Sequence, residues 1–350
     1  MADGGAVRIS VIIPCFQEAR FIARCLDSII NGDFDFAASG SEIFVIDGMS
    51  DDGSRDIIAD YARRYDFLHM LDNPDKIQVK ALNIGLRQAS GDLIFRCDAH
   101  SEYPKDYFPV LIQHHAAGLA DNIGVRCDSA PGDDGRVARA IAAVLSSPVG
   151  VGMSHRSLSG REPLFVDTVP FGSWKREVFE RFGPYDEAFI RAQDLEHNMR
   201  IKARGARVAL LPWISVKYYS RESFRKLIQK AYQYGYWKNM VNKKHRLLST
   251  KRQLFPPALV AFMVLSPLLM LEEEIGRPLA FAGWAVYLAL IGAASAVDAW
   301  RLRDPLSWPL LIAAYFCLHV AYGIGYLAGL FNVVIRSRFR LSDMLTRVTR

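Results

Sequence analysis

The sequence predicts an α/β domain with a mostly parallel sheet, followed by apolar helices toward the carboxyl end. Two observations carry this prediction. Short apolar segments alternate with helical patterns of about 10 to 15 residues through the first hundred residues, which is typical of βαβ units. After residue 252 the composition changes to long stretches without charged side chains, as expected of helices that enter a membrane.

The first predicted strand covers residues 7–14, a near-continuous apolar run of the kind that is buried on both faces of a sheet. Residues 18–30 then place apolar side chains at helical spacing. Further strands are expected at 43–46, 67–71, 93–97 and 208–211, and helices at 55–64, 79–89 and within 188–204. Between 104 and 167 the clearest signal is a turn at 131–135.

Charge is unevenly distributed along the 350 residues, whose formal net charge is +6. Residues 217–252 hold eleven basic residues against one acid, Glu222. A basic cluster beside apolar segments is typical of a membrane surface that carries anionic lipids. Nucleic-acid binding is the competing interpretation, but no recognised nucleic-acid module accompanies the cluster, so we expect no nucleic-acid partner.

The five cysteines show no CxxC spacing, which argues against a zinc site or a disulfide framework and favours a reducing compartment. The N-terminus does not show a basic region followed by an apolar run, so we expect no secretory signal. Any membrane contact is therefore expected at the carboxyl end.

Three charge-free stretches, 253–271, 278–297 and 305–335, approach or exceed the roughly 20 residues that span a bilayer. The predicted organisation is an α/β domain at 1–215, a basic amphipathic interfacial segment at 216–252, a membrane region of two to three helices at 253–335, and a basic tail at 336–350. If all three stretches cross, this tail lies on the side opposite the α/β domain, against the positive-inside tendency. Either one stretch does not cross, or the tail is an exception.

Acidic side chains follow three of the predicted strands: Glu18, Asp47 and Asp98. Ligands of open parallel sheets bind beyond the carboxyl ends of the strands, so we expect these acids to form one pocket. Asp98 and His100 could share one divalent cation, because the residue between them points away. A carboxylate beside nucleotide oxygens favours Mg²⁺ or Mn²⁺, so the pattern suggests a nucleotide-diphosphate site. The alternative is a strand-end cap with a surface histidine.

Two further acids, Asp194 and Glu196, stand where the helix within 188–204 is expected to begin. Acids often occupy this position simply because they complement the helix dipole. The functional interpretation makes Asp194 a general base that removes a proton from an attacking hydroxyl.

Four motifs occur in order along the chain: Pro14-Cys15-Phe16-Gln17-Glu18, Asp47-Gly48-x-Ser50-x-Asp52-Gly53-Ser54, Asp98-x-His100 and Gln193-Asp194-x-Glu196. Together they resemble the family 2 glycosyltransferases with the GT-A fold, over residues 7–230. Asp-Ala-His in place of the usual Asp-x-Asp, together with the apolar carboxyl-terminal part, is most similar to the ExoA-like succinoglycan glucosyltransferases.

This resemblance implies a Rossmann-like GT-A domain that transfers a sugar, with inversion, from a nucleotide donor expected to be UDP-glucose. The residues it implies for donor binding are Pro14, Cys15, Phe16, Glu18, Asp47, Ser50 and Asp98. It also implies that Asp98 and His100 meet Mn²⁺ or Mg²⁺ and that Asp194 is the catalytic base.

The chain departs from the family pattern in two places. Gln193 stands where the family often has an acid before the base. The processive members carry Gln-x-x-Arg-Trp, whereas here Gln233 and Trp237 are kept and Tyr236 takes the arginine position, which favours addition of a single sugar. The alternative for this aromatic cluster is a belt at the membrane interface.

Residues expected on the acceptor side are Phe171, Gly172, Trp174, Glu196, Arg200, Gln233 and Trp237. Trp174 could stack on a sugar, and the basic residues after it could meet a lipid pyrophosphate. The alternative is a capped surface turn.

These expectations describe a multi-pass enzyme of the cytoplasmic (inner) membrane whose catalytic domain faces the cytoplasm. It would move one hexose to a hydroxyl of a lipid-linked saccharide in exopolysaccharide or cell-envelope glycan synthesis. A nucleotidyltransferase is an alternative, but it should carry a glycine-rich, basic loop after the first strand, which residues 14–18 lack. A non-catalytic, membrane-anchored nucleotide-binding scaffold is the other alternative. Transport is disfavoured, because no acid or basic residue lies inside the apolar stretches.

Overall fold

The computed structural model describes residues 7–152, 156, 158–220 and 223–335, which form two compact units. Unit 1 comprises the chain up to Asp128 together with Leu158–Tyr218, and unit 2 comprises Ser129–Ser157 together with the residues from Tyr219 onward. The boundary expected at 215 lies close to the end of unit 1. The grouping of Ser129–Ser157 with the second unit was not expected, and the tail expected at 336–350 lies outside the described residues.

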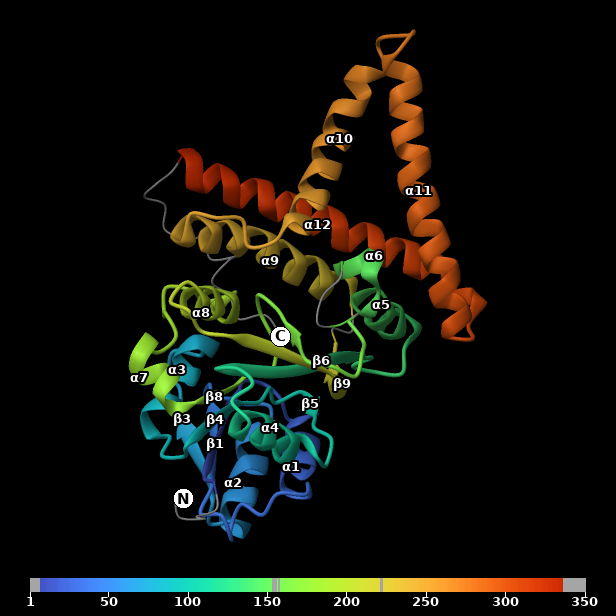
Figure 1. The fold of residues 1–350 in the computed structure, drawn as a ribbon. Coiled ribbons are helices and arrows are strands. Elements are labelled where there is room, and N and C mark those ends of the chain that lie inside the picture. The colour runs from blue at the N-terminus through green and yellow to red at the C-terminus, as the bar shows by residue number, and fades with distance from the viewer. Residues whose placement is uncertain (1–6, 153–155, 157, 221–222, 336–350) are drawn as a thin grey trace. The chain divides into compact units, whose positions relative to one another are not determined.

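Unit 1 is built on a nine-stranded mixed sheet with the order β3-β2-β1-β4-β8-β6-β9-β5, and β7 pairs with β9 (Figure 1). The parallel strands are β1 (Ile9–Cys15), β2 (Glu42–Asp47), β3 (Leu68–Asp72) and β4 (Leu93–Arg96). The other strands are β5 (Ser101–Glu102), β6 (Asn122–Ala130), β7 (Leu164–Phe165), β8 (Ser173–Lys175) and β9 (Val208–Tyr219). β9 extends well beyond the predicted 208–211, because burial continues to alternate from Pro212 to Tyr218.

Side chains of the parallel strands alternate between two hydrophobic cores on opposite faces of the sheet, as the two-residue period of a strand requires. In β1, for example, Ile13 joins one core and its neighbour Ile12 joins the other. The first core includes side chains of α1 (Ile22–Ile30), α2 (Ser54–Arg64) and α4 (Tyr107–Ala116). The second includes side chains of α3 (Gln78–Gln88), α7 (Arg176–Phe182) and α8 (Gln193–Lys202).

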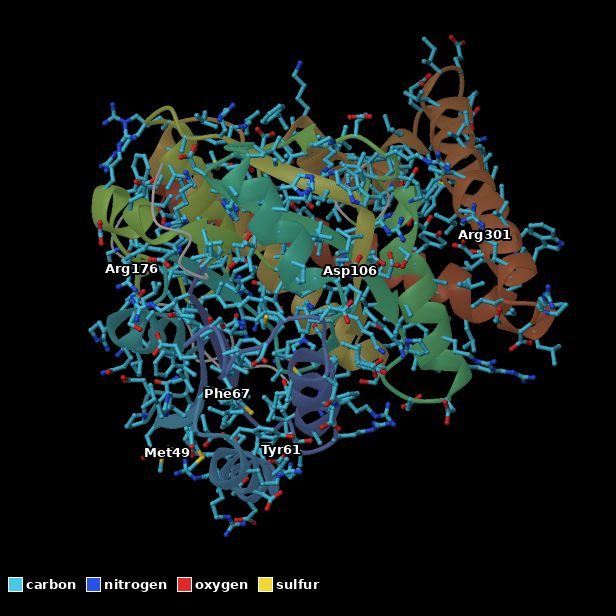
Figure 2. The ribbon with its side chains drawn as sticks, turned by 60° about the horizontal axis from the view of Figure 1, so that its bottom comes forward. Met49, Tyr61, Phe67, Asp106, Arg176 and Arg301 are labelled. Atoms are coloured by element: carbon cyan, nitrogen blue, oxygen red, sulfur yellow. The ribbon has the colours of Figure 1, made fainter. Side chains whose placement is uncertain are left out.

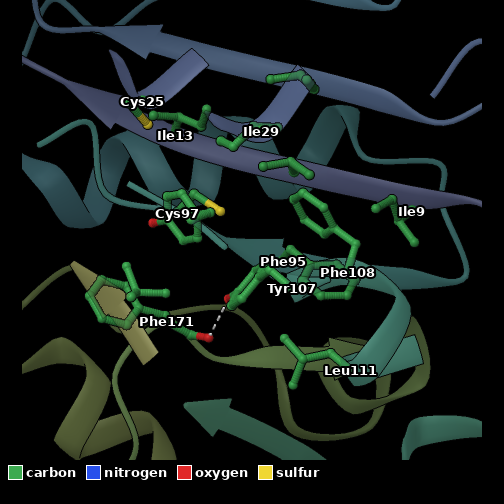
Figure 3. Close-up of a cluster of buried hydrophobic side chains, with 14 of the residues drawn as sticks. Ile9, Ile13, Cys25, Ile29, Phe95, Cys97, Tyr107, Phe108, Leu111 and Phe171 are labelled. Atoms are coloured by element: carbon green, nitrogen blue, oxygen red, sulfur yellow. Dashed lines mark hydrogen bonds between the residues drawn. The ribbon is translucent and has the colours of Figure 1, made fainter. Parts of the chain in front are cut away.

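The first core is held by aromatic side chains and a few hydrogen bonds. Tyr61 of α2, labelled in Figure 2, donates its hydroxyl to Asp27 of α1 at 2.5 Å. Phe95 and Phe108 meet edge to face with centroids 5.1 Å apart, which is a favoured arrangement of two rings (Figure 3). The hydroxyl of Tyr107 donates to the carbonyl of Phe171 at 3.0 Å, which ties the loop before β8 to this core.

Unit 2 is helical. Its elements are α5 (Arg136–Ser146), α6 (Pro148–Val151), α9 (Phe224–His245), η1 (Lys251–Leu254), α10 (Phe255–Leu269), α11 (Gly276–Arg301), η2 (Pro305–Ser307) and α12 (Trp308–Ile335). A third hydrophobic core joins side chains from α5, α9, α10, α11 and α12. Three segments, Lys251–Leu269, Gly276–Arg301 and Pro305–Val334, are long and apolar enough to cross a membrane, which suggests that the protein associates with one.

Candidate active site

The parallel strands β1, β2 and β4 bring the predicted site residues to one edge of the sheet. Cys15 is in register with Asp47, and Ile12 is in register with Arg96. The amide of Gly48 donates to the carbonyl of Cys15 at 2.8 Å, so β1 and β2 end side by side. The predicted convergence of strand ends is therefore present in unit 1.

The loops that follow β1 and β2 are joined by hydrogen bonds. The amide of Gln17 donates to Ser50 Oγ at 2.9 Å, and the amide of Glu18 donates to Ser54 Oγ at 2.7 Å. The first and second sequence motifs thus form one surface. Ser50 was predicted to bind the donor, and in the structure its hydroxyl links these two loops.

Asp47 is fully buried, and its carboxylate is already engaged. It accepts hydrogen bonds from the amide of Ser50 at 2.9 Å and from the Ser50 hydroxyl at 2.6 Å. Arg55 donates to the same carboxylate at 2.9 Å and to Asp72 at 2.8 Å. These contacts show Asp47 shaping the loop; direct contact with a nucleotide stays a prediction.

Asp52 lies on the outer side of the same loop. Burial raises its pKa, but hydrogen bonds from the Ser54 hydroxyl and from the amides of Ala19 and Ser54 outweigh this and leave the pKa below its ordinary value. Asp52 is therefore a carboxylate at neutral pH and holds the Glu18 loop against the start of α2.

Strained backbone positions gather around these loops. Gln17, Met49 and Ala192 have φ values of 57°, 58° and 58°, a region that residues other than glycine seldom adopt. Gln17 and Met49 lie in the two joined loops, and Ala192 directly precedes α8. Such strain is often found at functional sites, because surrounding contacts must hold it in place. The residue types at these positions do not predict a positive φ.

The segment after β4 supplies Asp98 and His100, which contact different partners. The Nδ1 atom of His100 lies 3.1 Å from a carboxylate oxygen of Glu18, and its ring meets the edge of Tyr218 at 4.6 Å between centroids. Asp98 Oδ1 accepts a hydrogen bond from Arg96 at 3.1 Å, and the Asp98 amide donates to the Tyr103 hydroxyl at 2.7 Å. Glu18 and His100, from the segments that follow β1 and β4, therefore meet.

These residues could bind a divalent cation only if a bound substrate supplied the remaining metal ligands. Among the described residues no group of three or more His, Cys, Asp or Glu side chains could hold a metal ion. Mg²⁺ commonly binds through one or two protein groups together with substrate phosphates, so a smaller set is compatible with a bound diphosphate. The carboxylate of Asp98 and the imidazole of His100 are the kinds of oxygen and nitrogen donor that Mn²⁺ or Mg²⁺ accepts.

Arg96, the last residue of β4, joins the two parts of the site. Its guanidinium contacts Asp98 at 3.1 Å and Asp194 at 2.5 Å, although only 9% of the arginine side chain is exposed. Burial lowers the pKa of Arg96, but the charges of Asp194 and Asp98 more than offset this and raise it well above the ordinary value. A permanently charged arginine thus lies between the two carboxylates.

Sequence reasoning missed Arg96. The signal was a basic residue at the end of the otherwise apolar strand Leu93–Arg96, since a charged side chain is seldom buried unless it is paired. Asp194 lies near the start of α8, as predicted, and 36% of its side chain is exposed.

Several residues predicted for the acceptor side are buried parts of the fold. Trp174 is 3% exposed and packs edge to face against Phe179 and His197, with centroids 5.4 Å and 5.9 Å away. Phe171 is 3% exposed in the first core, and a side chain at Gly172 would overlap the ring of Trp174. This burial argues against the predicted stacking of Trp174 on a sugar.

Glu196 and Arg200 also serve the fold. Glu196 is fully buried and pairs with Arg200 at 3.1 Å, one turn further along α8. Arg200 in turn donates to the carbonyls of Phe182 and Pro184, the latter at 2.7 Å. The pair fastens α8 to the end of α7, so the predicted acceptor contact of these two side chains is not supported.

Gln233 and Trp237 belong to unit 2. Both lie on α9 and are almost completely buried there, with exposed fractions of 2% and 3%. Their role at the acceptor side stays a prediction.

The mixed sheet, its two layers of helices and its acidic strand ends define the GT-A class of fold. Residues 10–183 match the profile of "Glycosyl transferase family 2", and the chain belongs to the family 2 glycosyltransferases. The family and fold predicted from the sequence are therefore confirmed. Membership of this family supports a glycosyltransferase over the two alternatives, the nucleotidyltransferase and the non-catalytic scaffold.

Two relatives match along nearly their whole length. The succinoglycan biosynthesis protein ExoA of Rhizobium meliloti is 28% identical over 324 residues, which cover 90% of this chain and 93% of that protein. The dolichyl N-acetyl-alpha-D-glucosaminyl phosphate 3-beta-D-2,3-diacetamido-2,3-dideoxy-beta-D-glucuronosyltransferase of Methanococcus voltae is 26% identical over 333 residues, covering 90% and 95%.

Two solved structures share the fold. The mannosyltransferase PcManGT of Pyrobaculum calidifontis, in complex with GDP-Man and Mn²⁺, matches with a TM-score of 0.59 and 19% identity, covering 93% of this chain and 88% of that one. TarS of S. aureus, residues 1–349 with UDP-GlcNAc, matches with a TM-score of 0.51 and 15% identity, covering 96% and 95%. At these identities the likeness shows the fold alone.

Proposed function

We propose that this glycosyltransferase moves a single hexose, with inversion, from UDP-glucose to a hydroxyl of a lipid-linked saccharide in exopolysaccharide or cell-envelope glycan synthesis. The names of the two relatives support this, because one acts in succinoglycan biosynthesis and the other on a dolichyl-phosphate-linked sugar. The two solved structures contain nucleotide sugars, which supports a nucleotide-sugar donor.

The observation that carries the proposal is the ion pair of Arg96 with Asp194, beside Asp98. Arg96 contacts one oxygen of Asp194, so the carboxylate is oriented while 36% of its side chain stays open to an acceptor. Asp194 is then placed to take the proton of the acceptor hydroxyl as its oxygen attacks the anomeric carbon. The bond to the diphosphate breaks on the opposite face, which inverts the configuration.

Donor binding is assigned to the joined loops after β1 and β2. Pro14, Cys15, Phe16 and Glu18 would line the nucleotide, with the loop from Asp47 to Ser54 as their support. Asp98 and His100, with Glu18 beside the imidazole, would hold Mn²⁺ or Mg²⁺. The cation would supply charge neutralisation of the departing diphosphate.

Arg96 is proposed as a positioning residue. It touches both acids and keeps them from repelling each other while no donor is bound. Its charge does not depend on pH in the working range, because the two acids raise its pKa further.

The membrane region supports the assignment of a lipid-linked acceptor. A lipid tail stays in the bilayer, so a catalytic domain that acts on its head group must be held at the membrane surface. We assign residues 1–215 to catalysis, 216–252 to the interface, 253–335 to the membrane and 336–350 to a basic tail, with the catalytic part on the cytoplasmic side. The three long apolar segments support this assignment.

The test is turnover of nucleotide sugars by the full chain in membrane vesicles with a lipid extract. UDP release should be fastest with UDP-glucose, and the lipid product should gain the mass of one hexose. Asp194→Asn should lower turnover by about 10²–10⁴-fold, the usual contribution of a general base. Asp60→Asn is the matched control, because Asp60 forms only exposed pairs with Arg63 and Arg64 on α2. Equal turnover by parent and Asp194→Asn would refute the assignment of the base.

A further inference from the structure

The three long apolar helices of unit 2 are not equivalent. Within an 18-residue apolar segment of Pro305–Val334, the stretch that holds most of α12, half of the residues are buried in the structure, against 28% and 22% in the corresponding segments of the stretches with α10 and α11. A helix already covered by protein along much of its length has less apolar surface to offer to lipid. The number of crossings therefore cannot be read from length and composition alone.

α12 packs closely against α9. Glycines of both helices lie at the interface between them: a side chain at Gly235 would overlap the backbone of Tyr322, and one at Gly325 would overlap the backbone of Tyr232. Gly329 repeats this contact one turn later, against Tyr236. Backbones that approach this closely over successive turns are typical of tightly packed helix pairs.

Hydrogen bonds fasten the same contact. Asn239 of α9, 3% exposed, donates to the carbonyl of Tyr326 at 2.9 Å. Asn332 of α12 donates to the hydroxyl of Tyr236. The two helices therefore form one rigid layer, and α12 cannot change its direction without α9.

α9 is unsuited to the interior of a bilayer. Its 22 residues include six lysines and arginines and no acid: Arg225, Lys226, Lys230, Lys238, Lys243 and Lys244. Basic side chains at the middle of a bilayer are costly, whereas a basic helix at the level of anionic head groups is favoured. Because α12 runs along α9, a crossing by α12 would draw this charge into the hydrocarbon.

The hairpin of α10 and α11 has the opposite character. Large apolar side chains point away from the protein along both helices, among them Val264, Leu265, Leu268, Phe281, Val286 and Leu288. The segments Lys251–Leu269 and Gly276–Arg301 hold 19 and 26 residues, or about 28 and 39 Å of helix, close to and longer than a hydrocarbon core of about 30 Å.

Charge along this hairpin is polarised. Its turn carries Glu272, Glu273 and Glu274, and the one base beside them, Arg277, pairs with Glu273 at 2.9 Å. Its other end carries Lys251 and Arg252 before α10, and Arg301, labelled in Figure 2, at the end of α11. Asp304, just beyond, is fixed to Arg136 of α5 at 3.1 Å. Basic residues gather at the end that joins the rest of unit 2, as the positive-inside tendency requires of the cytoplasmic side.

We infer that the partner of these apolar surfaces is a lipid bilayer that the chain crosses only twice, through α10 and α11. The acidic turn lies on the far side, and α12 lies in the head-group layer of the near side, docked along α9. β9 ends at Tyr219 and α9 begins at Phe224, so unit 1 shares that near side. Two crossings reconcile the positive-inside tendency with the arginines that follow α12 in the sequence, at 336, 338, 340, 347 and 350.

Protease accessibility of the full chain in sealed membranes tests this arrangement without altering any buried residue. Cleavage sites are placed before Met1, between Glu273 and Glu274, and after Arg350, and protease is added to one face at a time. We expect the two terminal sites to be cut from the same face and the turn site only from the other face. A site after Arg350 that is cut from the face opposite the N-terminal site would overturn the inference. A turn site cut from the face of the N-terminal site would do so too.

A matched pair of lysine substitutions gives an independent result. Val286 of α11 and Ile324 of α12 are both exposed and lie near the middle of their helices, with exposed fractions of 70% and 46%. Val286→Lys should shift the insertion equilibrium by roughly a hundredfold and lower the fraction of protein that resists alkaline extraction. Ile324→Lys should leave that fraction within about twofold of the parent, because a lysine is tolerated at the interface. Equal losses for both variants would show that α12 crosses, and no loss for either would show that the hairpin does not.

Discussion

Replacing Arg96 with methionine should cost the protein both stability and turnover. The guanidinium is 9% exposed and contacts Asp98 and Asp194 at 3.1 Å and 2.5 Å, so its loss leaves two carboxylates facing each other without a cation. Breaking a buried pair costs roughly 3–5 kcal/mol. Because Asp194 is 36% exposed and can recover water, we expect about 2–3 kcal/mol.

In a thermal unfolding experiment on the full chain in detergent, this loss corresponds to a midpoint lowered by roughly 5–10 °C. Arg63→Met is the matched control, because Arg63 is 77% exposed and pairs with Asp60 on the surface of α2, where an ion pair contributes little. Its midpoint should move by less than about 2 °C.

Turnover separates positioning from general stability. Arg96→Met should lower kcat for UDP release at least about tenfold, measured below the unfolding temperature, with a smaller change in KM for the acceptor. Arg96→Lys keeps the charge but cannot reach both acids with one planar group, so it should recover only part of the rate.

A double-mutant cycle with Asp194→Asn decides whether the ion pair is responsible. In the Asp194→Asn background, Arg96→Met should cost about 1–2 kcal/mol less than in the parent, since the partner charge is already gone. If Arg96→Met costs the same stability in both backgrounds, Arg96 acts on packing alone and the reasoning about the ion pair is wrong.

Three further outcomes are expected. His100→Ala should raise the concentration of Mn²⁺ or Mg²⁺ needed for half-maximal turnover by at least about tenfold. The control is His69→Ala, at an exposed histidine on β3, which should leave that concentration unchanged. If neither variant changes it, His100 is not part of the metal site. Trp174→Ala should cost about 3–5 kcal/mol of stability, because the ring is 3% exposed, while KM for the acceptor stays within about twofold below the unfolding temperature; a selective rise in KM would restore the sugar-stacking role. Burial lowers the pKa of His115 to about 4 and of His197 to about 3. Below pH 6.5 these two histidines therefore bind protons in the unfolded chain but stay neutral in the folded protein, which favours unfolding. Stability should therefore fall by about 2 kcal/mol per histidine between pH 6.5 and pH 5, and His197→Phe should make the fall in thermal midpoint smaller.

The parallel half of the sheet could be predicted from the sequence, because strands buried on both faces leave continuous apolar runs between helical patterns. β9 was predicted too short, since its later part alternates between buried and exposed side chains and includes Pro212. Its length is determined by pairing with strands that lie far away in the sequence.

The site was predictable where it consists of residues that follow strands. The four motifs lie at strand ends or at the start of a helix, and the sheet brings Glu18 and His100 into contact. Arg96 was missed because its partner Asp194 comes 98 residues later and no local pattern joins them. The burial of Trp174 could not be predicted, because an aromatic side chain beside basic residues looks the same in sequence whether it faces a ligand or, as here, the rings of Phe179 and His197.

The insertion Ser129–Ser157 limits how the catalytic part can be isolated. Its helix α5 buries Ala140, Ile141 and Val144 in a hydrophobic core whose other members come from α9 to α12. A fragment cut at residue 215 keeps this insertion but loses every helix that covers it, so an apolar stripe would face water and invite aggregation. A soluble fragment for crystallisation would therefore need two changes. The insertion Ser129–Ser157 would be replaced by a short polar linker between Asp128 and Leu158, and the chain would end after β9.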